Sequence, residues 1–174
     1  MRNVVLGITG SIAAYKAVEL TRCLKEKGHA VQIVMTQSAQ AFITPLTLQA
    51  ISGLEVRDEL FDTQVEAAMG HIELARWADL MLIAPATADC LAKLAHGLAD
   101  DLLTTLYLAT EAPVTVAPAM NQMMWLHPAT QANVTKLKEH AVQIVGPGEG
   151  KQACGEIGFG RMLEPLTIIN TLGL

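Results

Sequence analysis

Cys154 lies in the segment whose residue types point most directly to chemistry. The segment 146–162 is rich in glycine and shows neither helical nor strand periodicity, which is typical of a functional or mobile loop. A thiol in such a segment is not expected to serve as buried filler. The sequence therefore predicts that 146–162 is a flexible flap over a substrate and that Cys154 is reactive or donates a proton.

His71 is the candidate general base among five histidines. It begins a short helical pattern that leads directly into an apolar run, and an imidazole can take up and release a proton near neutral pH. The other four histidines lie among polar or helix-end residues, where a solvated or capping role is expected. Spacing alone leaves open whether His71 is catalytic or structural.

Gly10 and Ser11 stand where a first apolar run meets a helical pattern. Free N–H groups and the positive end of the helix dipole attract phosphate at such a turn. The glycines depart from the dinucleotide pattern G-x-G-x-x-G, and the end of the second apolar run, 35–38, carries no carboxylate to hold ribose hydroxyls. The turn therefore favours a mononucleotide such as FMN over NAD, with a plain turn without ligand as the alternative.

Polar residues also follow the third and fourth apolar runs. Thr87 and Asp89 come after the third run, and Asn121 comes after the fourth. Because the carboxyl ends of parallel strands border one crevice, we expect these side chains to face one site together with Ser11. Each could instead cap the helix that follows, and capping does not exclude contact with a ligand.

The elements that must position these residues alternate along the chain. Apolar runs predict strands, and periodic stretches between them predict helices, with breaks near Pro45 and Gly97. The predicted strands are 3–9, 30–35, 79–84, 113–117 and 142–145, and the predicted helices are 12–27, 38–52, 91–109 and 129–140. This alternation predicts an α/β, Rossmann-like three-layer sandwich with a parallel sheet, in a single domain covering 1–174.

Composition narrows the function classes. The chain is 51% hydrophobic and 17% charged, which excludes a disordered protein, and this scarcity of charge suggests that copies of the chain cover part of its surface. A net charge of -5 without a cluster of basic residues argues against nucleic acid. No apolar run approaches the length of a membrane span. Three cysteines without a C-x-x-C pair argue against a disulfide framework or a zinc site and fit the cytoplasm.

Four motifs together resemble those of the homo-oligomeric flavin-containing cysteine decarboxylases, over nearly the whole chain. The motifs are Gly10-Ser11, His71-Ile72-Glu73-Leu74, Pro118-Ala119-Met120-Asn121 with Met124-Trp125, and Ala153-Cys154-Gly155 with Gly160-Arg161-Met162. The asparagine and cysteine motifs are the specific ones. The resemblance implies a carboxy-lyase of coenzyme A biosynthesis that uses FMN to convert 4'-phosphopantothenoylcysteine into 4'-phosphopantetheine.

The resemblance also assigns roles to residues. His71 would be the base and Cys154 the proton donor; Asn121 would bind the substrate carboxylate beside Met120 and Ala153, and Arg76 is a weaker candidate at a subunit contact. The implied FMN contacts are Gly10, Ser11, Ile12, Thr36, Ser38, Thr87, Ala88, Asp89 and Cys90. No metal is implied.

The resemblance implies a route to CO2 loss through transient oxidation. FMN would oxidise the substrate's thiol to a thioaldehyde, the resulting β-thioketo acid would lose CO2, and the reduced flavin would return the electrons. FMN would lie between subunits of a trimer, which can assemble into a dodecamer, and a ligase domain would be fused or separate. The alternatives are a peptidyl-cysteine decarboxylase of the same family, a non-catalytic flavin-binding regulatory subunit, and an NAD-dependent oxidoreductase.

Overall fold

A five-stranded parallel sheet forms the centre of the molecule. The structure, a computed structural model, describes residues 1–60 and 70–174. The strands are β1 (Asn3–Ile8), β2 (Ala30–Met35), β3 (Leu80–Ala86), β4 (Val114–Pro118) and β5 (Gln143–Ile144), in the order β2-β1-β3-β4-β5. This arrangement confirms the predicted α/β sandwich.

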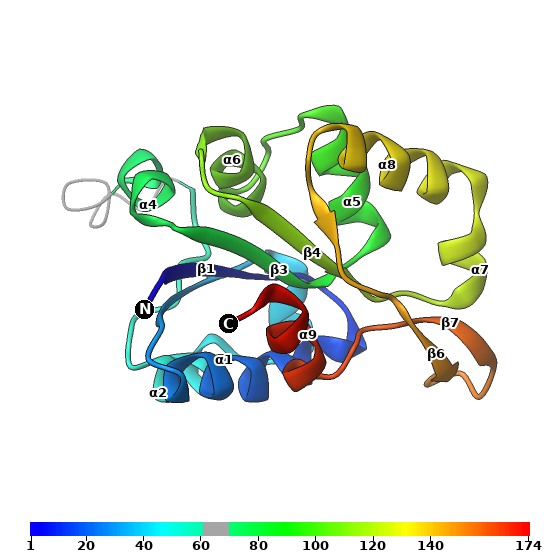
Figure 1. Ribbon diagram of the computed structural model, residues 1–174, viewed down its shortest axis with the longest axis horizontal. Helices are drawn as coiled ribbons and strands as arrows, with labels where there is room; N and C mark the ends of the chain where they lie inside the picture. Colours follow the sequence, from blue (N-terminus) through cyan, green and yellow to red (C-terminus); the bar gives the residue numbers. More distant parts are fainter. Residues whose placement is uncertain (61–69) are drawn as a thin grey trace.

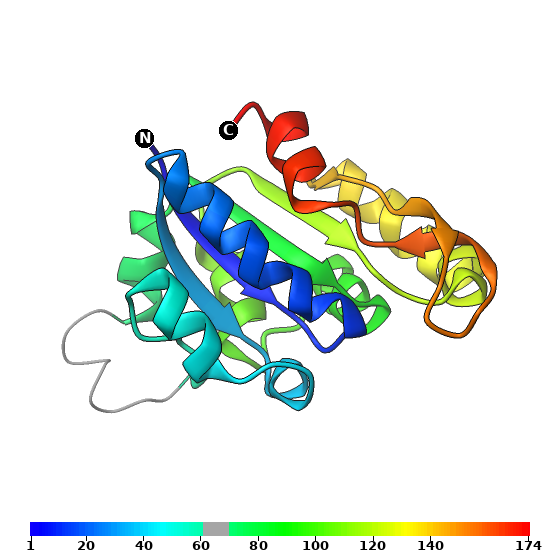
Figure 2. The ribbon, with the colours of Figure 1, turned by 90° about the horizontal axis from the view of Figure 1, so that it is seen from below.

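Helices cover both faces of the sheet (Figure 1), and Figure 2 shows the face covered by α1 and α9. One face carries α1 (Lys16–Glu26), α2 (Pro45–Ser52) and α9 (Pro165–Leu172), with the 3-10 turns η1 (Ile12–Tyr15) and η2 (Gln37–Ala41) nearby. The other carries α4 (His71–Trp77), α5 (Ala88–His96), α6 (Leu102–Ala109) and α8 (Pro128–Glu139). None of the helices in these two described stretches is long and apolar enough to cross a membrane.

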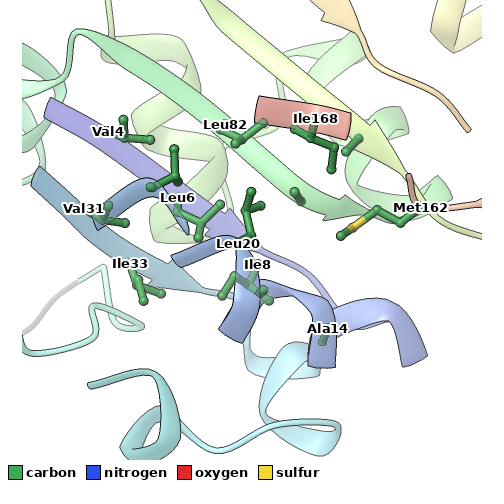
Figure 3. Packing of buried hydrophobic residues seen from close by; sticks show 14 of the residues in the cluster. Val4, Leu6, Ile8, Ala14, Leu20, Val31, Ile33, Leu82, Met162 and Ile168 are labelled. Atoms are coloured by element: carbon green, nitrogen blue, oxygen red, sulfur yellow. The ribbon is translucent and has the colours of Figure 1, made fainter. Parts of the chain in front are cut away.

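Successive side chains of β1 point to opposite faces of the sheet and pack into two separate hydrophobic cores. Val4, Leu6 and Ile8 pack with Leu20 of α1 and Ile168 of α9 on one face (Figure 3). The intervening residue Val5 belongs to the second core, which α4, α5, α6 and α8 cover. Each fully buried aliphatic side chain contributes about 1.5–3 kcal/mol, so the sheet is anchored from both sides.

Caps explain where the helices around the site begin and end. The Thr87 hydroxyl accepts a hydrogen bond from Cys90 N–H at the start of α5, and Gly97 ends that helix with φ of +67°. Asp101 and Thr104 form a capping box at the start of α6. Because Gly97 readily adopts a left-handed conformation, the predicted helical stretch over 91–109 divides there into two helices.

The structure adds elements that the sequence pattern did not predict. An antiparallel hairpin, β6 (Gly148–Lys151) and β7 (Ile157–Arg161), occupies the glycine-rich segment, and α7 (Gln122–Leu126) and α9 also lie outside the predicted ranges. Along β7 the buried positions are Gly158 and Gly160. Glycine carries no hydrophobic signal, so the alternation typical of a half-buried strand is invisible in the sequence.

Replacing Gly160 by alanine is expected to lower the free energy of unfolding by roughly 1–3 kcal/mol. A Cβ there would overlap the carbonyl oxygen of Met120, and φ is +144°. At Gly158 the three nearest atoms all belong to the flexible side chain of Gln122, so Gly158→Ala should cost less. Urea unfolding of both variants measures the difference, and a Gly160→Ala protein as stable as the wild type would contradict this account of hairpin docking.

Candidate active site

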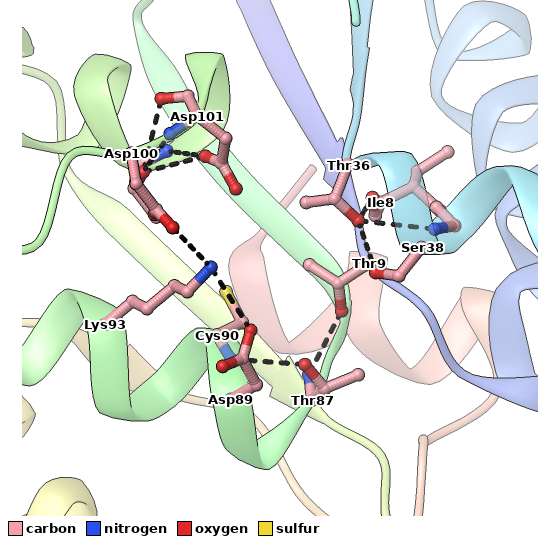
Figure 4. A network of polar contacts seen from close by, with 12 residues as sticks. Ile8, Thr9, Thr36, Ser38, Thr87, Asp89, Cys90, Lys93, Asp100 and Asp101 are labelled. Carbon is pink, nitrogen blue, oxygen red and sulfur yellow. Dashed lines mark hydrogen bonds and ion pairs between the residues drawn. The ribbon is translucent and has the colours of Figure 1, made fainter.

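The order of the strands reverses between β1 and β3, where the loops that follow these strands can separate and leave a crevice. Thr9 joins the two strand ends. Its hydroxyl donates to Pro85 O at 2.7 Å. The same hydroxyl accepts from Thr87 N–H at 3.1 Å (Figure 4). Thr9 is only 1% exposed, so these two bonds are shielded from water and fix the loop of Thr87 relative to Gly10 and Ser11.

A pocket of about 970 Å³ opens at the carboxyl ends of the strands. Its walls come from the ends of β1, β3 and β4, the start of η2, and the β6–β7 hairpin. Eleven of the residues chosen from the sequence line it, namely Gly10, Ser11, Ile12, Ser38, Thr87, Ala88, Asp89, Met120, Asn121, Ala153 and Cys154. The topology therefore brings together residues separated by up to 144 positions in the chain.

Thr36 and Cys90 support this pocket from behind its walls. The Thr36 hydroxyl lies 3.1 Å from the hydroxyl of Ser38, which lines the pocket. Cys90 is buried in the first turn of α5, where burial raises the pKa of its thiol, and the nearby Asp101 and Asp89 raise it further. Cys90 therefore remains an uncharged thiol under the site.

His71 is the one predicted catalytic residue that this chain does not bring to its own pocket. It begins α4, which packs against α6, and it is not part of the pocket lining. Its Nδ1 atom is buried and has no hydrogen-bond partner among residues 1–60 and 70–174. Arg76 lies on the same helix and is exposed.

The pocket fits a phosphorylated mononucleotide. Gly10 lies so close to Ser38 that a Cβ at position 10 would meet the serine side chain at 2.6 Å, which leaves the turn narrow and its backbone accessible. Hydroxyls of Ser11, Ser38 and Thr87 can bond phosphate oxygens, while Ile12 and Phe42 offer apolar surface to a ring. The volume suits such a ligand together with a small substrate. No carboxylate follows β2, as a dinucleotide would require.

Asn121 makes polar contacts with three residues of the connection between β6 and β7. Its side-chain N–H groups donate to Gln152 Oε1 at 3.3 Å and to Glu156 Oε2 at 3.0 Å, and the Cys154 sulfur lies 3.6 Å from the same nitrogen. Its Oδ1 accepts from Met123 N–H at 2.8 Å, which fixes the orientation of the amide. The thiol and the amide chosen from the sequence thus lie in contact.

Sequence reasoning missed Gln152 and Glu156. The signal available was their spacing, two residues to either side of Cys154, which can place side chains on one face of extended chain.

Lys16 was also missed, although its side chain is only 7% exposed and lines the pocket. Its ammonium donates to Met162 O at 3.0 Å and to Glu164 Oε1 at 2.7 Å, so it ties the end of the hairpin segment to α1. Burial of an ammonium is costly unless it is paired in this way. The signal in the sequence was a lysine one helical turn before Leu20, which lies on the buried face.

The proteins that this chain resembles are flavoproteins, in agreement with a pocket that fits a mononucleotide. The model of the family described as Flavoprotein matches residues 1–173. The chain is 58% identical over 168 residues to the coenzyme A biosynthesis bifunctional protein CoaBC of Vibrio vulnificus (strain YJ016). The aligned region covers 97% of this chain and 42% of that protein. The chain thus spans less than half the length of this curated relative.

Solved structures with the same fold cover almost the whole chain. A PPC decarboxylase mutant complexed with pantothenoylaminoethenethiol superposes with a TM-score of 0.86 at 36% identity, covering 99% of this chain and 96% of that one. The FMN-dependent cysteine decarboxylase SpaF gives a TM-score of 0.81 at 33% identity, with 97% and 94% covered.

Thr9→Val is expected to lower the free energy of unfolding by about 1–3 kcal/mol, because it removes a shielded hydroxyl and leaves Thr87 N–H without its partner. Amide hydrogen exchange at Thr87 should accelerate accordingly. Thr9→Ser keeps the hydroxyl and serves as the control. Equal stability and equal exchange at Thr87 in the two variants would show that the Thr9 hydroxyl does not join the strand ends.

Proposed function

The chain belongs to the flavoprotein family, and from this membership we propose that it binds FMN and removes CO2 from 4'-phosphopantothenoylcysteine in coenzyme A biosynthesis. The observation that carries the proposal is the contact of the Cys154 sulfur with the Asn121 amide, 3.6 Å apart, at a pocket that fits a mononucleotide. The similarity of the chain to CoaBC and to the PPC decarboxylase structure supports the choice of substrate.

The loop residues of the pocket would hold the cofactor. Gly10, Ser11, Ser38 and Thr87 supply a narrow turn and three hydroxyls for its phosphate, with the other predicted contacts around them. Bound FMN would supply a reversible two-electron oxidation of the substrate's thiol. The Thr9 hydrogen bonds hold two walls of this cradle at a fixed separation.

Asn121 would bind the substrate's carboxylate through its side-chain N–H groups. The amide is uncharged, so it orients the carboxylate without the strong ground-state stabilisation that a lysine or arginine would give. Met120 and Ala153 line the same part of the pocket. Asn121 thus positions the group that is lost.

Cys154 would supply the proton that decarboxylation consumes. Loss of neutral CO2 from a carboxylate leaves an electron pair on the remaining carbon, and a proton must be added there to give the product. The Cys154 thiol is exposed on the hairpin connection beside Asn121, so it can reach the carbon from which CO2 departed. The connection between β6 and β7 would act as the flap over the substrate.

A neighbouring copy of the chain would supply His71 as the base. Within one chain His71 lies outside the pocket, and large apolar side chains stand exposed at or near the rim of the pocket. They are Ile12, Tyr15 and Phe42, which are between 49% and 62% exposed and line the pocket. Such exposure fits a subunit interface, and we propose a cytoplasmic homo-oligomer, either a trimer or a dodecamer assembled from trimers. Arg76 would lie near the contact, and a ligase domain would be fused or separate.

Purified protein is expected to be yellow with a flavin spectrum and to convert 4'-phosphopantothenoylcysteine into a product lighter by one CO2 in mass spectrometry. A cysteine-terminated peptide, offered in parallel, should be unchanged. Release of CO2 from the peptide alone would move the protein to peptidyl-cysteine decarboxylation. A colourless preparation that takes up no added FMN would remove the cofactor from the proposal.

Mixed oligomers test the shared site. His71→Asn and Asn121→Ala should each abolish turnover, and co-refolding of the two inactive proteins should restore part of it, because some sites then combine an intact His71 with an intact Asn121 from another copy. Refolding each variant alone is the control. No recovery in verified mixed oligomers would place both residues in a single-chain site.

A further inference from the structure

Asn121 has no N–H group left for a substrate. The amide nitrogen carries two hydrogens, and its two oxygen partners are Glu156 Oε2 at 3.0 Å and Gln152 Oε1 at 3.3 Å. The sulfur of Cys154 is a longer and weaker acceptor. A carboxylate can therefore bind to Asn121 only if one of the two oxygens leaves.

Gln152 is held in place by further bonds. Its Oε1 also accepts from Gln122 N–H at 3.1 Å, and its Nε2 donates to Phe159 O at 3.1 Å. It is half-buried between the hairpin and the start of α7. Displacing this side chain would break these two bonds and the bond to Asn121, together with a weak contact to the Cys154 sulfur at 3.8 Å.

Glu156 is held much more weakly. It is exposed, and apart from Asn121 its carboxylate contacts only the thiol of Cys154, at 3.7 Å. In the part of the chain that the structure describes, it makes no ion pair. Glu156 is thus the partner that an incoming carboxylate can replace, and it is itself a carboxylate.

On the basis of the function proposed above, we propose that the Glu156 carboxylate occupies the carboxylate-binding position on the Asn121 amide until the substrate's carboxylate displaces it. The displaced Glu156 carboxylate then remains close enough to repel the substrate's carboxylate. Glu156 belongs to the same short connection as Cys154, so displacement leaves its negative charge near the bound substrate. This repulsion weakens binding of the carboxylate.

The same repulsion assists the reaction. When the C–C bond to the carboxylate breaks, CO2 leaves uncharged and the electron pair moves toward the ene-thiolate sulfur. Negative charge therefore moves away from the carboxylate-binding position on Asn121, and so away from Glu156, as the reaction proceeds. A repulsion present in the bound substrate and relieved in the transition state raises KM and kcat together.

Glu156→Gln tests this, because glutamine keeps an oxygen acceptor for Asn121 and removes the charge. We expect KM and kcat for 4'-phosphopantothenoylcysteine both to fall roughly tenfold, with kcat/KM changed little. Glu149→Gln, the same change at an exposed position of β6 outside the pocket lining, should leave both constants unchanged. A merely structural role for Glu156 would lower kcat/KM without this compensation.

Binding measurements separate the inference from the proposed function. Glu156→Gln should bind 4'-phosphopantothenoylserine, which carries the carboxylate but a hydroxyl in place of the thiol, roughly tenfold tighter than the wild type does. Its affinity for 4'-phosphopantetheine, which lacks the carboxylate, should be unchanged. Unaltered affinity for the serine compound, or equal changes for both ligands, would overturn the inference. Wild-type protein that binds both ligands but releases no CO2 would instead overturn the proposed function.

Discussion

The hydrogen bond from Met120 N–H to Gly160 O, at 2.9 Å, holds the hairpin against the end of β4, and the chemistry of the site depends on this contact. It brings the connection between β6 and β7 over Asn121, so that an amide and a thiol distant in sequence come into contact. The approach requires glycine at 160, since any side chain there would overlap the Met120 carbonyl. Lys16 secures the segment beyond the hairpin to α1 through the carbonyl of Met162.

The strands and most helices could be predicted because buried parallel strands read as continuous apolar runs and the helices keep their periodicity. The convergence of Ser11, Thr87 and Asn121 also followed from the sequence, since the ends of parallel strands share one edge. The hairpin could not be predicted, because its buried positions are glycines. The bonds of Glu156 and Gln152 to Asn121 were inaccessible for the same reason, as they exist only once the hairpin is docked.

His71 shows a different limit of what can be predicted from the sequence. Sequence pattern and resemblance single it out, yet the geometry of one chain keeps it outside the pocket that holds Asn121 and Cys154. The exposed apolar side chains near the rim and the buried, unpartnered Nδ1 of His71 among the described residues are both features that a second copy can explain. If the site is divided between copies, as proposed above, it cannot be assembled from the local periodicity of one sequence.

The central claim is that Cys154 adds a proton after CO2 has left, and the product of Cys154→Ser tests it most directly. Mass spectrometry after incubation with 4'-phosphopantothenoylcysteine should show the oxidised ene-thiol, which has lost CO2 and carries two hydrogens fewer than 4'-phosphopantetheine. Cys23→Ser, on α1 and outside the pocket lining, should give the normal product. Formation of 4'-phosphopantetheine by Cys154→Ser at the wild-type rate would contradict the claim.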